Sequence, residues 1–174
     1  SYQTYAGPEN LEKRQRFFRY NYLGTAIKDS EIFTYNAQDV LISSIVWKGD
    51  LTGRDPVLTG ASADKKVSET DYTGPENEEI RLRQRRYDSA GTTVKETEFF
   101  DLTANVLTSS TVYRGDINTA GRASAVKISY QTYAGPENLE KRQRFFRYNY
   151  LGTAIKDSEI FTYNAQDVLI SSIV

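Results

Sequence analysis

Few side chains in this sequence could do catalytic chemistry. The 174 residues contain no cysteine and no histidine, which excludes thiolate nucleophiles, disulfides, and the commonest general base and metal ligand. Carboxylates are plentiful, and two at the right separation could act as a glycosidase acid and base. The candidates flank Gly-Pro-Glu-Asn turns, where solvated loops are expected, and they are Glu9, Glu12, Glu76, Glu78 and Glu79. We predict that the chain is not an enzyme and has no cofactor.

Two loop segments could bind a partner or an ion. Arg114, Gly115 and Asp116 form Arg-Gly-Asp, the tripeptide that integrins read on an exposed loop. A strand-ending turn explains the same letters, because Gly-Asp is turn chemistry. The segment with Asp50 and Asp55 offers hard oxygen ligands on a glycine-rich loop, which suits calcium. It lacks the dense Asp spacing of a calcium-binding loop, so we assign no metal site.

Aromatic residues are dense for so polar a chain, at 13% of the sequence. One interpretation is that they form cross-strand pairs within a sheet. The other is that exposed Tyr and Trp side chains form a contact surface for another chain or for sugars. The candidate binding residues are therefore Tyr20, Tyr35 and Trp47, together with Arg114, Gly115 and Asp116.

Charge and hydropathy restrict the partners. Charged residues make up 26% of the chain but almost cancel, with a net charge of −1. A nucleic-acid-binding protein needs a net positive face to release counterions, so we predict no nucleic-acid partner. The mean hydropathy is −0.59, and no apolar run approaches the roughly 20 residues of a membrane helix, so no membrane insertion is expected. The absence of cysteine and the many Tyr and Thr residues favour an extracellular or cell-surface location.

The sequence is organised as a tandem array of repeats. Residues 1–46 and 129–174 are identical and lie 128 positions apart. An imperfect copy stands between them, because "GPENLEKRQRFFRYNYLGTAIKDSE" from Gly7 is answered by "GPENEEIRLRQRRYDSAGTTVKETE" from Gly74. We divide the chain into repeat A (1–66), repeat B (67–127) and a truncated second repeat A (128–174). Self-similarity of this kind is typical of stacked-repeat architectures.

The sequence of each repeat predicts four short strands. In repeat B these are "VSETDY", "EIRLRQRRY", "TTVKETEFFD" and "VLTSSTVYRGD", rich in β-branched and aromatic residues and separated by turn sequences. The second segment has one alternative in repeat A, where "LEKRQRFFRY" follows a proline and could begin a helix. The longest linkers follow the fourth strand, where insertions are tolerated.

Opposite charges are expected to meet across the second and third strands. A tight turn at "NYLG" places Arg16 opposite Asp29 and Arg14 opposite Glu31. The same geometry in repeat B places Arg83 opposite Glu96 and Arg81 opposite Glu98. Directly opposed charges stabilise a sheet by about 0.2–1 kcal/mol per pair. The basic run "RLRQRR" is therefore interpreted as half of an ion-pair ladder.

Neither face of this hairpin is wholly apolar, unlike the faces of an ordinary sandwich sheet. The fourth strand, "VLISSIVW", is apolar on both sides except at Ser43 and Ser44. A single repeat consequently has little to bury. We expect it to depend on its neighbours along the array, as the units of repeat proteins do.

The segment "RRYDSAG", with its echo "FRYNYLG", resembles the YD-repeat proteins of the RHS type. Those repeats read roughly Tyr-Asp-x-x-Gly followed by a strand. Tyr87, Asp88 and Gly91 carry the full pattern, and Tyr20 and Gly24 keep it around an Asn. The resemblance covers about half of each repeat. It implies a long spiralling β-ribbon, which forms a shell around a cargo in some members and a surface or adhesion structure in others.

Together these patterns predict an all-β tandem array of antiparallel hairpins in meander order, forming an extended ribbon or a β-solenoid-like stack. The predicted function is structural: a scaffold, fibre or cell-surface component whose partners are neighbouring repeats of the same chain or identical chains. An adhesin-like or carbohydrate-binding module and a YD-repeat shell around a cargo are the functional alternatives. A propeller with one four-stranded blade per repeat is the architectural alternative.

Overall fold

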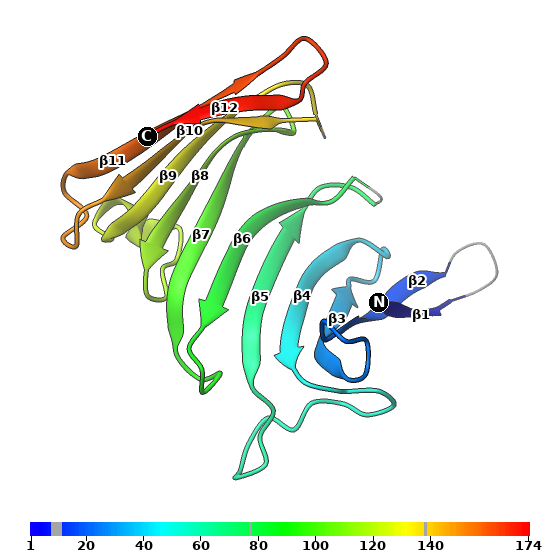
Figure 1. The fold of residues 1–174 in the computed structure, drawn as a ribbon. Coiled ribbons are helices and arrows are strands. Elements are labelled where there is room, and N and C mark those ends of the chain that lie inside the picture. The colour runs from blue at the N-terminus through cyan, green and yellow to red at the C-terminus, as the bar shows by residue number, and fades with distance from the viewer. Residues whose placement is uncertain (8–11, 77, 138) are drawn as a thin grey trace. The chain divides into compact units, whose positions relative to one another are not determined.

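A computed structural model describes residues 1–7, 12–76, 78–137 and 139–174. The chain forms one open sheet of twelve antiparallel strands, in which every strand lies beside its neighbours in sequence (Figure 1). The strands are β1 (Tyr2–Ala6), β2 (Lys13–Tyr20), β3 (Ile27–Tyr35), β4 (Leu41–Lys48), β5 (Lys66–Thr73), β6 (Ile80–Tyr87), β7 (Val94–Thr103), β8 (Val106–Arg114), β9 (Lys127–Ala134), β10 (Lys141–Tyr148), β11 (Ile155–Tyr163) and β12 (Leu169–Ile173).

The prediction of an all-β meander with four strands per repeat is confirmed. The helix considered for "LEKRQRFFRY" is wrong, because Lys13–Tyr20 forms β2. The propeller is also wrong, because its blades would be separate sheets, whereas β4 and β5 of successive repeats are hydrogen-bonded to each other. Glu9 lies outside the described residues.

The chain divides into two compact parts, Ser1–Lys95 and Glu96–Val174. The division falls within β7, in the middle of repeat B. Each part therefore contains one place where a repeat meets the next. In the N-terminal part β4 of repeat A pairs with β5 of repeat B, and in the C-terminal part β8 of repeat B pairs with β9 of the second repeat A.

The turn after the second strand is longer than the tight turn predicted at "NYLG". The amide of Asn21 donates to the carbonyl of Ala26 at 2.8 Å, and the Asn21 side chain accepts the amide of Thr25 at 3.0 Å. Gly24 has a φ of 70°, a left-handed conformation that favours glycine. The same backbone pattern recurs at Asp88, whose amide donates to Thr93, and at Asn149, whose amide donates to Ala154.

This turn changes the register of the hairpin. Tyr20 lies opposite Ile27, and Arg19 lies opposite Asp29 with an ion pair between them. Arg16 faces Ile32 instead. The rungs predicted between Arg16 and Asp29 and between Arg14 and Glu31 are therefore wrong, because a closure from Asn21 to Ala26 leaves more residues in the loop than a tight turn does.

The linkers fold back and attach to the third strand of their own repeat. In repeat A the hydroxyl of Ser30 donates to the carbonyl of Gly49 at 2.8 Å and accepts the amide of Leu51 at 3.0 Å. In repeat B, Thr97 makes the same two hydrogen bonds, to Gly115 at 2.7 Å and from Ile117 at 3.1 Å. Both hydroxyls are completely buried, so the linkers supply part of the cover that a second sheet would give in a sandwich.

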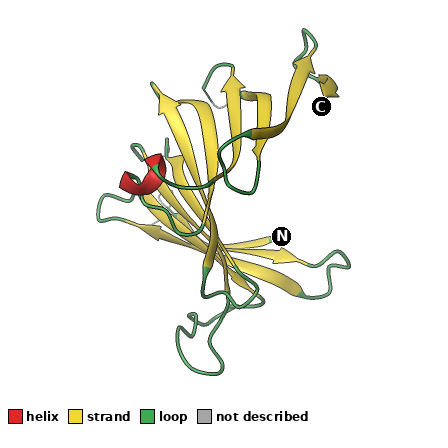
Figure 2. Ribbon diagram, turned by 90° about the vertical axis from the view of Figure 1, so that its left-hand side faces the viewer, coloured by secondary structure: helices red, strands yellow, loops and turns green. Residues whose placement is uncertain are grey.

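An arginine holds each linker in place. The guanidinium of Arg16 on β2 donates to the carbonyl of Leu51 at 2.8 Å and to Asp55 at 2.7 Å. In the linker of repeat B, Arg122 lies on a short helix, Ala120–Ala123 (Figure 2), and forms a two-pronged ion pair with Asp101 at 2.8 and 2.9 Å. Paired hydrogen bonds between Arg and a carboxylate fix geometry as well as charge.

Little apolar surface is buried, as expected from the sequence. Within the described residues the buried apolar side chains are Phe18, Phe33, Val46, Trp47, Leu51, Phe99, Val112, Tyr113 and Phe161. The small hydroxyl residues Ser44 and Ser110 are buried at corresponding positions of β4 and β8. The interior is therefore thin, and it includes polar groups that must keep their hydrogen bonds.

Replacing Ser30 with Ala should destabilise the protein by about 1–3 kcal/mol, because the buried amide of Leu51 loses its acceptor. The matched control is Ser158→Ala in the second repeat A. Ser158 lies in the same sequence but is half-buried, and no linker follows it within this chain. Urea denaturation of both variants measures the difference. Equal losses of stability would contradict the role given to the linker.

A second ion pair organises the linker of repeat A. Arg54 donates to both oxygens of the Asp64 carboxylate, at 2.6 and 2.9 Å, and the amide of Val57 donates to the same carboxylate at 2.8 Å. The hydrogen bond from Arg54, followed by that from Val57, lowers the pKa of Asp64 to about 2. The linker is thus closed on itself by a charged group that titrates only in strong acid.

Because the pKa of Asp64 is lowered by folding, its contribution to stability is complete above its ordinary value of 3.8 and is lost as the pH falls toward about 2. We expect Asp64→Asn to lose stability at neutral pH and to show a smaller further loss in acid than the unmodified protein. Urea midpoints measured across this range check the difference. Parallel pH profiles for the two proteins would rule out this contribution.

Candidate functional site

The feature that recurs most regularly is the contact between successive repeats, which we call the repeat joint: the fourth strand of one repeat paired with the first strand of the next. Ser44 lies opposite Thr70 at the first joint, and Ser110 lies opposite Gln131 at the second. Every other pair corresponds in the same way, including a bulge near the end of each ladder. The two joints therefore have one register although the strands differ in sequence.

The ladder continues past the assigned strands at both joints. The amide of Lys48 donates to the carbonyl of Lys65, and the amide of Arg114 donates to the carbonyl of Val126, each at 2.9 Å. These bonds connect the end of the fourth strand with the end of the linker, just before the next first strand begins. The linker therefore returns the chain to a fixed starting point for the next repeat.

A glutamate connects each repeat to the one before it. The carboxylate of Glu79 in repeat B accepts the amide of Leu41 in repeat A at 3.0 Å. Glu140 in the second repeat A accepts the amide of Leu107 in repeat B, also at 3.0 Å. A charged acceptor makes a stronger hydrogen bond than a neutral one. The equivalent residue of the first repeat, Glu12, is exposed.

The turn that carries the Tyr-Asp-x-x-Gly pattern also contacts the preceding repeat. A Cβ atom on Gly91 would lie 2.5 Å from the backbone nitrogen of Lys66, and one on Gly152 would lie 2.6 Å from that of Lys127. Gly24 in the first repeat adopts the same conformation but has no atom that close. The glycine of the pattern thus serves both the turn and its close approach to the end of the preceding linker.

The two identical segments show directly what the neighbouring repeat contributes. Val46 on β4 is 7% exposed, whereas Val174, its counterpart at the end of the chain, is 81% exposed. Ser44 is buried, and its counterpart Ser172 is exposed. Val46 is followed by Trp47 and the linker and lies beside β5, whereas Val174 is the last residue of the sequence, so the difference in burial reflects both the residues that follow β4 and the strand that pairs with it.

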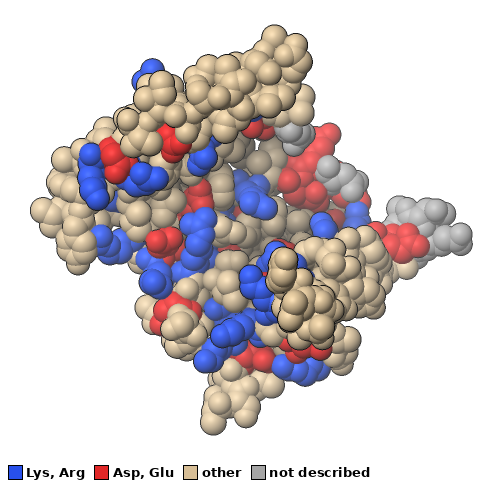
Figure 3. Space-filling model, in the orientation of Figure 1, with Lys and Arg blue, Asp and Glu red and all other residues tan. Residues whose placement is uncertain are grey.

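The basic run of β6 forms a charge ladder, but with β5. Arg83 pairs with Asp71 at 2.6 Å, and Arg85 pairs with Glu69 at 3.2 Å. Although burial raises the pKa of Glu69, the hydrogen bond from Tyr87 and the charge of Arg85 lower it below its ordinary value. Acidic and basic side chains accordingly lie next to one another on the face seen in Figure 3. The rungs proposed for Arg83 with Glu96 and for Arg81 with Glu98 stay predictions.

The predicted aromatic binding residues occupy different environments. Trp47 is only 4% exposed, with the ammonium group of Lys66 5.7 Å from its ring centre. Tyr35 is half-buried and its hydroxyl donates to the carbonyl of Arg14 at 3.0 Å. Tyr20 is 41% exposed. The structure does not gather the three into one exposed surface.

Within the Arg-Gly-Asp tripeptide, Arg114 belongs to the repeat joint. Its guanidinium lies 4.1 Å from the ring centre of Tyr150 and donates to the carbonyl of that residue at 3.0 Å. The carbonyl of Gly115 accepts the hydroxyl of Thr97, while Asp116 is exposed. The arginine is thus engaged within the chain, whereas the aspartate is exposed.

The calcium hypothesis gains no geometric support. Asp50 accepts the amide of Thr52 at 2.7 Å, and Asp55 pairs with Arg16. Over the described ranges, no three residues among His, Cys, Asp and Glu are gathered as metal ligands would be. The described part of the chain also contains no helix with the length and hydropathy needed to span a membrane.

Sequence reasoning missed the residues that form the joint. From the sequence, Glu79 is expected in a solvated loop, and Glu140, Ser30 and Thr97 are not singled out. One signal was available: each position keeps its chemistry in every repeat, as Glu12, Glu79 and Glu140 do. Comparison with known proteins adds nothing to this, since no protein-family model and no curated protein matches the chain.

Glu79→Ala should destabilise the protein by about 1–3 kcal/mol, because the half-buried amide of Leu41 loses a charged acceptor. Glu12→Ala is the matched control: the same residue type at the same position of a repeat that has no predecessor within this chain. We expect it to change stability by less than about 0.5 kcal/mol, as surface substitutions usually do. Thermal and urea unfolding compare the two. A Glu79 variant as stable as the control would remove this residue from the joint.

Proposed function

We propose that this chain is a segment of a structural scaffold in which each repeat adds four strands to one continuous sheet. The observation that supports this most strongly is the shared register of the two repeat joints. A joint that is reproduced by different sequences can be reproduced again, and so the sheet can be extended by further repeats. This is how a repeat protein builds length without a new interface for each unit.

The contacts also suggest how the scaffold resists deformation. Each joint combines a backbone ladder with a carboxylate that accepts an amide across it, as Glu79 does from Leu41. Each linker is fixed by a buried hydroxyl and by an arginine. Such connections distribute load over many weak bonds. We place this scaffold in a fibre or a cell-surface structure, outside the cell.

The resemblance to YD-repeat proteins remains a proposal within the same function. The pattern Tyr-Asp-x-x-Gly, or its Asn form, is associated with one turn geometry at Asp88, Asn21 and Asn149. In a YD-repeat shell this turn would recur along a ribbon that encloses a cargo. The recurrence supports a YD-type ribbon and leaves the choice between a shell and a fibre to experiment.

A binding module is the second candidate, favoured by the exposed tips of two turns. Tyr22 is fully exposed and Leu23 is 75% exposed, while their counterparts Tyr150 and Leu151 are 78% and 67% exposed. Exposed Tyr side chains suit contacts with sugars or proteins, since they combine apolar area with a polar group. Glycan binding that Tyr22→Ser and Tyr150→Ser abolish would favour this candidate.

The scaffold proposal is tested by lengthening the chain with further B and A repeats. We expect the unfolding free energy and its dependence on denaturant to rise by similar steps with each added pair, because each step adds the same joints. The measurement is equilibrium urea unfolding of the series. Repeats that unfold independently, at one midpoint whatever their number, would contradict the proposal.

A further inference from the structure

The two outermost strands of the sheet carry the two halves of a repeat joint. The sequence of β1 occurs again at the end of β9, where it pairs with the preceding fourth strand, β8. The sequence of β12 occurs also at the start of β4, where it pairs with the following first strand, β5. Neither outer strand contains a charged residue or a proline. Natural edge strands usually carry such residues, which prevent pairing with other chains.

We propose that β12 of one chain pairs with β1 of a second copy in the register of the repeat joint, so that copies of this chain join head to tail. This inference rests on the proposed scaffold function and names its partner. By correspondence with the second joint, Ser172 would lie opposite Gln3, and Ile173 opposite Tyr2.

A pair equivalent to Ser172 and Gln3 already exists at the second joint within the chain. Ser110 and Gln131, the same residue types at the same positions of the joint, lie opposite each other, and the Gln131 amide group donates to the Ser110 hydroxyl at 3.3 Å. Ser172 is exposed, and so is Gln3. Pairing would give both side chains the contact that their counterparts have.

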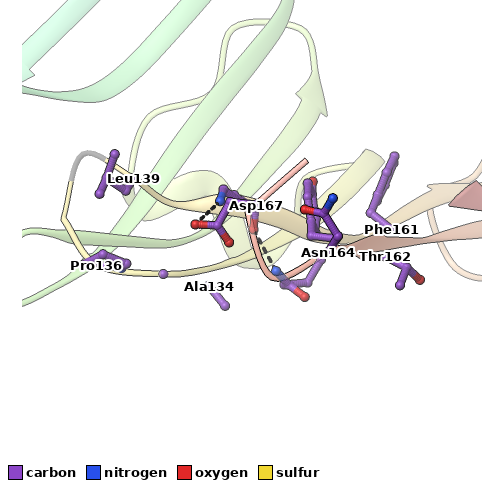
Figure 4. Close-up of a pocket in the computed structure, with 11 residues that line it drawn as sticks. Ala134, Pro136, Leu139, Phe161, Thr162, Asn164 and Asp167 are labelled. Atoms are coloured by element: carbon purple, nitrogen blue, oxygen red, sulfur yellow. Dashed lines mark hydrogen bonds and ion pairs between the residues drawn. The ribbon is translucent and has the colours of Figure 1, made fainter. Parts of the chain in front are cut away.

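A pocket at the turn between β11 and β12 marks where the second copy would dock. It has a volume of about 490 Å³ and lies between two turns: Pro136 and Leu139 come from the turn after β9, and Asn164 and Asp167 from the turn after β11 (Figure 4). Lys141 lines it and pairs with Asp167 at 2.7 Å.

At the corresponding place in repeat A, the next repeat supplies carboxylates. Lys13, the counterpart of Lys141, pairs with Glu76 of repeat B, and Glu79 accepts the amide of Leu41. In the second repeat A the counterpart of Leu41 is Leu169, which is 49% exposed. Glu12 of a second copy is the residue that would reach this amide, as Glu79 and Glu140 do within the chain. The pocket therefore suits an acidic turn.

Pairing would also cover exposed apolar surface at both ends. Ile173 and Val174 are 68% and 81% exposed, and Tyr2 is 49% exposed. Their counterparts inside the array are less exposed, as Val46 shows with 7%. Because the two edges differ, the contact is heterologous, and each new copy leaves one edge of each kind open for the next.

The chain lacks cysteine, so single introduced thiols report the register directly. Gln3→Cys and Ser172→Cys chains, one of them carrying a mass tag, are mixed in equal amounts in a glutathione redox buffer. Random collisions give heterodimers twice as often as either homodimer. We expect a heterodimer excess of at least fivefold over that ratio. The control mixes Thr4→Cys with Ser172→Cys. Thr4 lies one residue from Gln3, so its side chain points to the opposite face of the sheet, and this mixture should give the random ratio.

A second variant tests the pocket. Glu12→Ala in the Gln3→Cys chain should lower the heterodimer excess at least threefold, whereas Glu78→Ala, an exposed glutamate of repeat B, should leave it unchanged. A random ratio in every mixture, or an excess of Ser172→Cys homodimers, would overturn the head-to-tail joint. Neither result would touch the scaffold proposal, which depends on the stability of lengthened chains rather than on contacts between chains.

Discussion

Backbone pairing between the fourth strand of one repeat and the first strand of the next is the contact on which this structure depends. Without it the fourth strand is an edge, and its side chains are exposed, as β12 shows. With it, the same residues become buried, as Val46 and Ser44 are on β4. The repeat is therefore a unit of sequence, whereas the burial that stabilises it belongs to the joint between units.

The linkers supply a second part of the interior. A single sheet has no opposing layer, and these strands carry too many charged residues to form an apolar face. Buried hydroxyls at Ser30 and Thr97 bind linkers that bring Leu51 and Ile117 back to the sheet, and Arg16 and Arg122 hold those linkers by ion pairs. A hydroxyl is suited to this position because it donates to one linker group and accepts from another.

The strands could be predicted from the sequence because β-branched and aromatic runs alternate with glycine-rich turns in every repeat. The hairpin register could not, since it depends on the hydrogen bonds of the turn. Asn21 closes on Ala26, and this places Arg19 rather than Arg16 opposite Asp29. The joint residues could not be predicted either, because Glu79 stabilises the joint through a hydrogen bond from the amide of Leu41, which belongs to another repeat and lies 38 positions earlier. Aromatic density left both cross-strand pairs and an exposed contact surface open, and Trp47 lies inside, where β4 meets β5.

Amide hydrogen exchange, followed by NMR on segmentally labelled protein, tests most directly whether neighbouring repeats stabilise one another. The identical sequences of β4 and β12 are compared, as are those of β1 and the matching residues of β9, so that intrinsic exchange rates cancel. Protection reports the free energy of local opening. The account predicts that β4 and β9, each inside a joint, exchange at least a hundredfold more slowly than their copies at the sheet edges. With the protein diluted until copies no longer pair, equal protection of the two copies would show that each repeat is stable by itself, and would contradict the account.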